Sequence, residues 1–253
     1  MVHELRFPSD PPDGDYTELP RLRAELPNGK NIPQKDGVWH NIYEDSIVSV
    51  SAGPIQHSVP SLGYVVAEAP VPGKMNPQNY MPHLKRTKTP MSAMRTLQQG
   101  GSITLSDGTR LDGPPRRPGR KIVILGDTCN PQGIVPIAGD ADLLIHEATN
   151  AYLPGIDENT KALDSYQSVQ DRTISRGHST PQMAGRFAKQ IGAKKLILNH
   201  FSSRYHGDDD VNQESKIVMD AIGGLAANEY GAPVLCARDM MSVDIDHRSK
   251  ELD

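Results

Sequence analysis

The fold is decided by residues 121–128, KIVILGDT, an apolar run that ends in a Gly-Asp pair. Two later stretches follow the same pattern: residues 141–149, ADLLIHEAT, and residues 194–205, KKLILNHFSSRY. Continuous apolar runs of this length are typical of strands covered on both faces, as in a parallel sheet. The sequence therefore predicts an α/β fold built on buried strands.

The segment between the second and third runs predicts a helix. In residues 180–192, TPQMAGRFAKQIG, Thr180 suits the N-cap, Pro181 the first helical position and Gly192 the position after the last turn. A second helix is expected over residues 211–229, and strand–helix–strand alternation favours α/β. Further strands are expected in SIVSVSAGPI (46–55), LGYVVAEAP (62–70), PVLCAR (233–238) and MSVDID (241–246).

Charge is distributed unevenly along the chain. Residues 74–121 hold ten Lys or Arg and two acidic residues, a net charge of +8, whereas the remainder carries −12. This segment is rich in Pro and Gly, and it predicts a short helix over 91–98 and a hairpin over 102–111 that turns at Asp107-Gly108. We interpret it as a projecting arm for a polyanion such as RNA, although a solvated loop would also carry such charge.

The rest of the sequence indicates where the domain begins and which cellular compartment is expected. Residues 1–45 lack a sustained period and predict an irregular segment, which leaves 46–253 as the domain. Cys129 and Cys236 are the two cysteines, so no disulfide framework is implied and a reducing, intracellular compartment (cytoplasm or nucleus) is expected. The chain has no apolar run of membrane-spanning length and no signal-peptide pattern after Met1.

Polar side chains stand at the ends of the three apolar runs. Asp127, Glu147 and His200 each close one run, and ligands of α/β folds bind beyond the carboxyl ends of the strands. The helix that begins after His178-Ser179-Thr180 presents free N–H groups that suit a phosphate. Each residue alone has a structural interpretation, as a cap or a partly buried side chain, and only their joint spacing indicates a site.

The residue types fit metal and proton chemistry. Imidazoles of His57 and His200 can hold zinc, and the carboxylate of Asp127 can bridge two ions. Glu147 and His178 can form a carboxylate–imidazole pair that transfers a proton. On a strand His146 points away from Glu147, so we expect His146 to be structural.

Six stretches carry a family resemblance. They are IQHSVPSLGYVVAE (55–68), VPGKMNPQ (71–78), ILGDT (124–128), LLIHEAT (143–149), GHSTPQMAGRFAK (177–189) and LILNHFSSRY (196–205). With these stretches in this order, the sequence resembles ribonuclease Z, the tRNA 3′-processing endonuclease family of the metallo-β-lactamase superfamily, and most closely its short form. The resemblance implies the C-terminal half of an αββα sandwich, two zinc ions and removal of 3′ trailers from precursor tRNA by a homodimer.

The resemblance also implies a role for each matching residue. His57 would bind the first zinc, Asp127 would bridge both ions and His200 would bind the second. Glu147 and His178 would form the pair that assists departure of the product. Residues 68–115 would be a flexible tRNA-gripping arm. The substrate-binding residues would be Lys85, Arg86 and Lys88 in the arm, and Ser202, Arg204 and Tyr205 near the phosphate.

One family signature does not occur in the 253 residues. The His-x-His-x-Asp-His motif, which supplies further ligands to both ions, is absent. We therefore expect this chain to be the C-terminal portion of a ribonuclease Z whose other half is not included, and to be incomplete as an enzyme by itself. Two alternatives stay open: a tRNA-binding fragment without hydrolysis, and a subunit whose metal site is completed by a partner chain.

Overall fold

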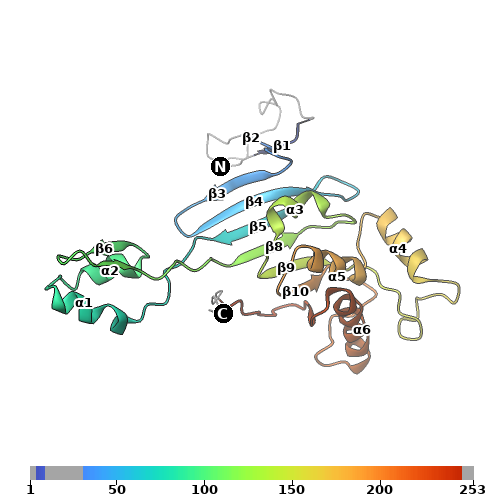
Figure 1. Cartoon of the computed structure of the whole chain (residues 1–253). Coiled ribbons are helices and arrows are strands. Elements are labelled where there is room, and N and C mark those ends of the chain that lie inside the picture. The colour runs from blue at the N-terminus through green and yellow to red at the C-terminus, as the bar shows by residue number, and fades with distance from the viewer. Residues whose placement is uncertain (1–3, 9–30, 247–253) are drawn as a thin grey trace, which may run out of the picture. The chain divides into compact units, whose positions relative to one another are not determined.

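A seven-stranded mixed sheet organises most of the chain in the computed structural model, which describes residues 4–8 and 31–246. The strand order is β11-β10-β9-β8-β5-β4-β3 (Figure 1). The four strands β8 to β11 are parallel, whereas β5 pairs antiparallel with β8 and β3 pairs antiparallel with β4. The bounds are β3 Trp39–Glu44, β4 Val48–Ile55, β5 Ser61–Glu68, β8 Lys121–Leu125, β9 Leu143–Glu147, β10 Leu196–Asn199 and β11 Val234–Cys236.

The three apolar runs form β8, β9 and β10, as predicted. Their side chains Val123, Leu144 and Leu198 are fully buried. The strands are in parallel register, with Asn199 beside Glu147. Because parallel strands end at the same edge of a sheet, the polar residues that follow them are brought to one place. The α/β prediction is thereby confirmed.

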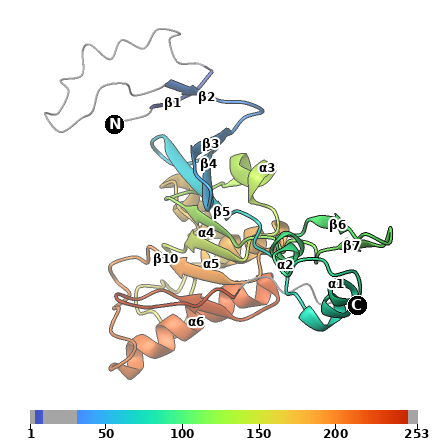
Figure 2. The same ribbon diagram turned by 90° about the vertical axis from the view of Figure 1, so that its left-hand side faces the viewer.

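Two helices cover part of the sheet. The first, α5 (Pro181–Gln190), begins at Thr180, whose side chain accepts a hydrogen bond from the N–H of Met183. It packs against β9 and β10, and against α6 (Gln213–Tyr230), which also contacts β11 (Figure 2). At the crossing, a Cβ on Gly185 would lie 2.3 Å from the carbonyl oxygen of Ala226. This glycine therefore lets the two helices approach closely.

A short segment after β8 packs on the antiparallel part of the sheet. It comprises η2 (Gln132–Ile134) and α3 (Val135–Ala138). Ile134 is fully buried. A Cβ added to Gly53 would lie 2.9 Å from Ile134, and one added to Gly63 would lie 2.7 Å from it. Glycines on β4 and β5 thus leave room for this side chain.

Two irregular segments were predicted where the structure has regular elements. The prediction for residues 1–45 is wrong at its C-terminal end, because β3 pairs with β4, and β2 (Asn31–Pro33) pairs with β1 (Glu4–Arg6). Residues 1–3 and 9–30 lie outside the described residues. Residues 151–176, whose polar composition predicts a surface loop, contain α4 (Tyr166–Ser175), which a capping box at Ser165 initiates.

The arm unit, Glu68–Arg120 with Asp246, is separate from the core unit, which comprises the other described residues up to Ala67 and from Lys121 to Ile245. It has its own small core, in which Leu84, Leu97 and Leu105 are buried. The predicted helix and hairpin are both present, and the arm runs five residues past the predicted end at 115. Its elements are η1 Pro77–Asn79, α1 Met81–Arg86, α2 Ala93–Gln98, β6 Ser102–Thr104 and β7 Arg110–Asp112.

The C-terminal end differs from expectation. β11 forms where PVLCAR was predicted to be a strand, but residues 241–246 form no strand. Within the part of the chain that the structure describes, no helix combines the length and apolar character needed to cross a membrane.

Candidate active site

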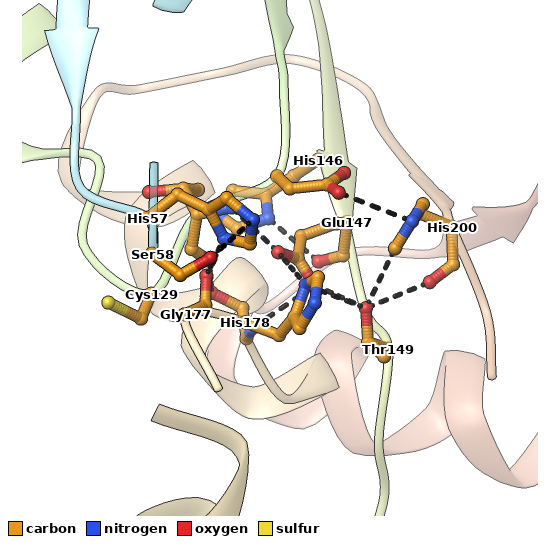
Figure 3. A network of polar contacts seen from close by, with 12 residues as sticks. His57, Ser58, Cys129, His146, Glu147, Thr149, Gly177, His178 and His200 are labelled. Atoms are coloured by element: carbon orange, nitrogen blue, oxygen red, sulfur yellow. Dashed lines mark hydrogen bonds and ion pairs between the residues drawn. The ribbon is translucent and has the colours of Figure 1, made fainter. Parts of the chain in front are cut away.

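Five predicted site residues converge at the carboxyl edge of the sheet. His57 follows β4, Asp127 follows β8, Glu147 ends β9, His178 precedes α5 and His200 follows β10. The rings of His57 and His178 are 4.9 Å apart, and those of His178 and His200 are 5.2 Å apart and stacked. Three imidazoles from distant parts of the sequence therefore share one small region (Figure 3).

Glu147 is the most enclosed acidic group of the site, with a relative exposure of 1%. Each carboxylate oxygen accepts two hydrogen bonds, so the group is already satisfied and is placed to fix its neighbours rather than to hold an ion. Oε1 accepts from the N–H of Thr128 (2.7 Å) and from His178 Nδ1 (3.0 Å), and Oε2 accepts from the N–H of Ser179 (3.1 Å) and from Thr149 Oγ1 (2.5 Å).

The contact with Glu147 determines the tautomer of His178. A carboxylate can only accept, so Nδ1 of His178 carries the hydrogen that it donates. Nε2 is then the nitrogen that can exchange a proton with a substrate. The pair predicted from the sequence is therefore in hydrogen-bond contact.

The Thr149 hydroxyl does the same for His200. Its single proton goes to Oε2 of Glu147 at 2.5 Å, which is charged and nearer than the carbonyl of His200 at 3.0 Å. The hydroxyl, 2.9 Å from His200 Nδ1, can then accept a hydrogen bond from that nitrogen, and this tautomer gives Nε2 the lone pair that a metal needs. Nε2 lies 3.4 Å from Asp127 Oδ2. His200 has φ +52°, an uncommon backbone conformation that recurs at functional sites.

His57 is held by a backbone carbonyl. Its Nδ1 lies 2.7 Å from the oxygen of Gly177 and must donate to it, so Nε2 faces the site with a lone pair. Gly177 has φ +83°, and a Cβ there would lie 2.5 Å from His57 Nδ1. A glycine is required both by the backbone conformation and by this approach.

The donor set fits a zinc ion. Ligand atoms of His57, Asp127 and His178 lie within 4.8 Å of one another, as do those of Glu147, His178 and His200. Imidazole nitrogens and a carboxylate are ligands that zinc accepts. His57 and His200 each have Nδ1 in a hydrogen bond, which leaves Nε2 for the metal, as in metal-binding histidines. The predicted set was His57, Asp127 and His200; the structure brings His178 between them.

His146 faces the opposite way from Glu147. It is fully buried, its ring packs edge-on against Phe187, and burial lowers its pKa. Its Nδ1 lies 2.8 Å from the carbonyl oxygen of Glu147. The side chain belongs to the core, as the alternation along the strand predicted.

The loop after β10 places the three predicted phosphate-binding residues differently. Ser202 is half-buried, and Arg204 is held by Asp157 at 3.0 Å. Tyr205 is only 7% exposed, and its hydroxyl lies 3.1 Å from the N–H of Ala151 and is contacted by Arg204. The Tyr205 ring is buried and supports Arg204, which lies over it at 4.6 Å, and the role of Tyr205 toward RNA stays a prediction.

The predicted arm residues lie in and just after α1. Lys85 and Lys88 are exposed, and Arg86 forms an ion pair with Asp107. The pKa of Asp107 is lowered to about 2, first by the N–H of Thr109 and then by further hydrogen bonds, including that of Arg86. Arg86 therefore has an acidic partner, whereas the two lysines present their charge to solvent.

Sequence reasoning missed Thr149 and Gly177 as parts of the site. Both lie inside quoted motifs, next to residues that were singled out. A threonine two residues after a buried glutamate, and a glycine directly before a histidine, are the local signals that could have marked them.

Comparisons with known proteins place the chain among ribonucleases. No family model matches it. A ribonuclease Z of Synechocystis is 31% identical over 94% of this chain and 67% of that protein, and a zinc phosphodiesterase ELAC protein 1 of Bos taurus is 40% identical over 81% and 55%. The crystal structure of human tRNase Z, short form, aligns with a TM-score of 0.47 and 27% identity, over 86% of this chain and 51% of that chain.

The matches cover most of this chain but only part of each relative. The chain spans about half to two thirds of the length of the curated relatives it matches. The match to the Synechocystis protein nevertheless covers nearly all of the present sequence, including every residue of the site described above. The chain belongs to the ribonuclease Z family.

Proposed function

We propose that this chain carries part of the active site of a zinc-dependent endoribonuclease that removes 3′ trailers from precursor tRNA. The observation that carries the proposal is the convergence of His57, Asp127 and His200 around the hydrogen-bonded Glu147–His178 pair. Relatives named ribonuclease Z and zinc phosphodiesterase support the same substrate and metal.

The roles follow from which atoms are already engaged. His57 and His200 each hold a hydrogen on Nδ1, so their Nε2 atoms would bind zinc, and the half-exposed Asp127 carboxylate would bridge. Bound zinc supplies an activated water and stabilises the leaving oxygen. Glu147 is enclosed by four donors and would orient His178, not bind an ion.

His178 would move the proton in this scheme. With Nδ1 hydrogen-bonded to Glu147, its Nε2 can protonate the leaving oxygen of the phosphodiester. The buried Glu147 is held by Thr128, Ser179 and Thr149, so the direction of proton transfer is fixed by the fold.

The ligand count supports the proposal that the site needs ligands from outside these 253 residues. Two protein ligands per ion fall short of the three that catalytic zinc sites use. The family's His-x-His-x-Asp-His motif does not occur in the sequence. We propose that these ligands come from residues outside the 253 considered, within a longer chain or on a partner.

The arm unit is proposed to bind tRNA. Lys85 and Lys88 are exposed on it, and basic groups gathered on one unit suit a phosphate backbone. The complete protein is proposed to act inside the cell as a homodimer. A non-catalytic tRNA-binding role is the second candidate, because the absent motif would leave binding intact while preventing cleavage.

A complementation assay tests the proposal. The chain is combined with the part of a ribonuclease Z that contains the His-x-His-x-Asp-His motif, and cleavage of precursor tRNA is measured with and without zinc. Cleavage at the 3′ end that requires both components and zinc supports the proposal. Tight binding of precursor tRNA without any cleavage in the complemented protein would favour the second candidate.

A further inference from the structure

Thr128 connects several parts of the candidate active site, and the scheme above uses only its backbone N–H. The residue directly follows Asp127 in the loop after β8 and is fully buried. Its hydroxyl lies 2.9 Å from the carbonyl oxygen of Gln56 and 3.1 Å from the backbone nitrogen of Asn130. A carbonyl can only accept and an N–H can only donate, so the hydroxyl donates to Gln56 and accepts from Asn130.

The hydroxyl of Thr128 thereby holds the turn that carries His57. Gln56 directly precedes His57, and the carbonyl of one residue and the nitrogen of the next belong to one planar peptide unit. Holding the Gln56 carbonyl therefore fixes the plane from which the His57 backbone starts. The same carbonyl accepts from the N–H of Cys129 at 2.8 Å, and the N–H of Gln56 donates to the Asn130 carbonyl at 3.0 Å. Of these three hydrogen bonds, the one from the hydroxyl can be removed by substitution without changing the backbone.

The backbone of Thr128 contacts the proton-transfer pair. Its N–H donates to Oε1 of Glu147 at 2.7 Å, and its carbonyl accepts from the Ser179 hydroxyl at 2.6 Å. Ser179 is also fully buried, and its own N–H donates to Oε2 of Glu147 at 3.1 Å. Thr128, Glu147 and Ser179 therefore form a closed ring of hydrogen bonds, and Ser179 directly follows His178. One buried residue thus connects the His57 turn with Glu147 and His178.

We propose that Thr128 is a positioning residue, whose hydroxyl sets the place of His57 relative to the Glu147–His178 pair. The inference rests on the proposed function, in which His57 would bind zinc and His178 would move the proton. The rings of His57 and His178 are 4.9 Å apart, and Nδ1 of His57 bonds to the carbonyl of Gly177, directly before His178. His57 is thus held at its backbone by Thr128 and at its ring by Gly177. Without the hydroxyl the turn can move, and a displacement of about 1 Å can cost on the order of 10²-fold in rate.

Two substitutions separate the hydroxyl of Thr128 from the shape of its side chain. Thr128→Val removes the hydroxyl and nearly keeps the shape, whereas Thr128→Ser keeps the hydroxyl. In the complemented protein, Thr128→Val should lower kcat for precursor tRNA by on the order of 10²-fold. KM should change little, because the proposed tRNA contacts of the arm unit are untouched. Thr128→Ser should regain most of the rate.

A spectroscopic measurement needs neither zinc nor cleavage. The full 253-residue chain is labelled with ¹⁵N-histidine, freed of metal by dialysis and measured in mildly alkaline buffer, where the ring nitrogens distinguish the imidazole tautomers. In the wild type, Nδ1 of His57 should carry the hydrogen that it donates to Gly177. In Thr128→Val, the two ring-nitrogen signals of His57 should shift toward each other, because the tautomer is no longer fixed. His146, whose Nδ1 bonds to the Glu147 carbonyl in the core, is the internal reference and should not change.

Thr173→Val is the matched control. Thr173 is also buried, and its hydroxyl donates to the Val169 carbonyl at 2.7 Å within α4, so this variant likewise loses one buried hydrogen bond. It should lose stability to urea much as Thr128→Val does, yet keep the wild-type kcat and the wild-type His57 signals. Thr128→Ala, which also lacks the hydroxyl, replaces Thr128→Val if the latter does not fold.

Unchanged His57 signals in Thr128→Val, or the same change in Thr173→Val, would overturn the inference. So would a wild-type kcat of Thr128→Val, or a Thr128→Ser variant as slow as Thr128→Val. If the wild-type complemented protein cleaves no RNA, the proposed function fails, and the His57 signals still decide the role of Thr128.

Discussion

At the scale of single residues, one hydroxyl decides which nitrogen of His200 can face a metal. Thr149 Oγ1 donates to Oε2 of Glu147 and can accept from His200 Nδ1. A side chain without a hydroxyl would leave the ring free to turn and Glu147 with one donor fewer. The metal ligand and the proton-transfer pair are thus coupled through Thr149.

Thr149→Val removes this hydroxyl while nearly preserving the shape of the side chain. Zinc affinity of the complemented protein should fall by roughly 10- to 100-fold, as it does when outer partners of ligating histidines are removed. Thr149→Ser keeps the hydroxyl and should retain most of the affinity. Competition with a chromogenic chelator measures both, and equal affinity in Thr149→Val and the wild type would refute the coupling.

His178→Ala tests the proton-transfer role. Cleavage by the complemented protein should slow by about 10²- to 10⁴-fold, because general acid catalysis contributes that much, while zinc content changes little. His40→Ala, an exposed histidine on β3, is the control and should keep full activity. Turnover of His178→Ala at the wild-type rate would remove His178 from the mechanism.

Gly177→Ala tests the contact that holds His57. A side chain there must adopt φ +83° and would approach His57 Nδ1 to 2.5 Å. The free energy of unfolding should fall by about 1–3 kcal/mol, and zinc binding should weaken because His57 is displaced. Gly139→Ala is the matched control, since a Cβ there meets nothing within 4 Å and its φ is −55°. Urea denaturation compares the two variants.

At the scale of elements, the crossing of α5 and α6 depends on Gly185. A Cβ at this position would lie 2.3 Å from the Ala226 carbonyl oxygen, so Gly185→Val should cost about 1–3 kcal/mol or more by separating the helices. Gly224→Ala, on α6 with open space around it, should instead stabilise by about 0.5–1 kcal/mol. Chemical denaturation should give these opposite signs; a loss in both variants would mean that the crossing is not the cause.

The same scale shows what the sequence could and could not predict. β8, β9, β10 and α5 were predictable because burial and capping leave a local pattern: apolar runs, and Thr180 before Pro181. β3 was not, because only Val38 and Trp39 of its region are buried and the stretch is otherwise polar. Residues 241–246 alternate as a strand would, yet none of the described strands pairs with them.

The residues of the candidate site also divide into those that the sequence pattern marks and those that it does not. Strand-end residues Asp127, Glu147 and His200 could be found because parallel strands end together. His57 and His178 could be named as candidates from their residue type and position, but only the family resemblance implied a definite role for each. Thr149 was missed because its contact with His200 spans 51 residues of sequence, so its position two residues after Glu147 did not reveal that it joins the two groups.

At the scale of the whole molecule, the arm unit should contribute affinity for tRNA but not stability of the core unit. Val71 and Arg117 pair through backbone hydrogen bonds of 3.0 and 2.9 Å, so a short Gly-Ser linker can replace residues 72–116. This deletion should weaken tRNA binding at least about tenfold. It should also make binding less dependent on salt, because the protein then contacts fewer phosphates and releases fewer counterions. Filter binding at several salt concentrations, with unchanged thermal unfolding of the core unit, is the measurement; unaltered binding would contradict the arm's role.

The central claim is that this chain supplies only part of a two-metal site. Elemental analysis of zinc after dialysis tests it most directly. The isolated chain should retain well under one zinc per molecule, whereas the protein complemented with the His-x-His-x-Asp-His motif should retain about two, and His57→Ala and His200→Ala should lower that number. One or more zinc ions held per isolated chain, or no gain on complementation, would contradict the account.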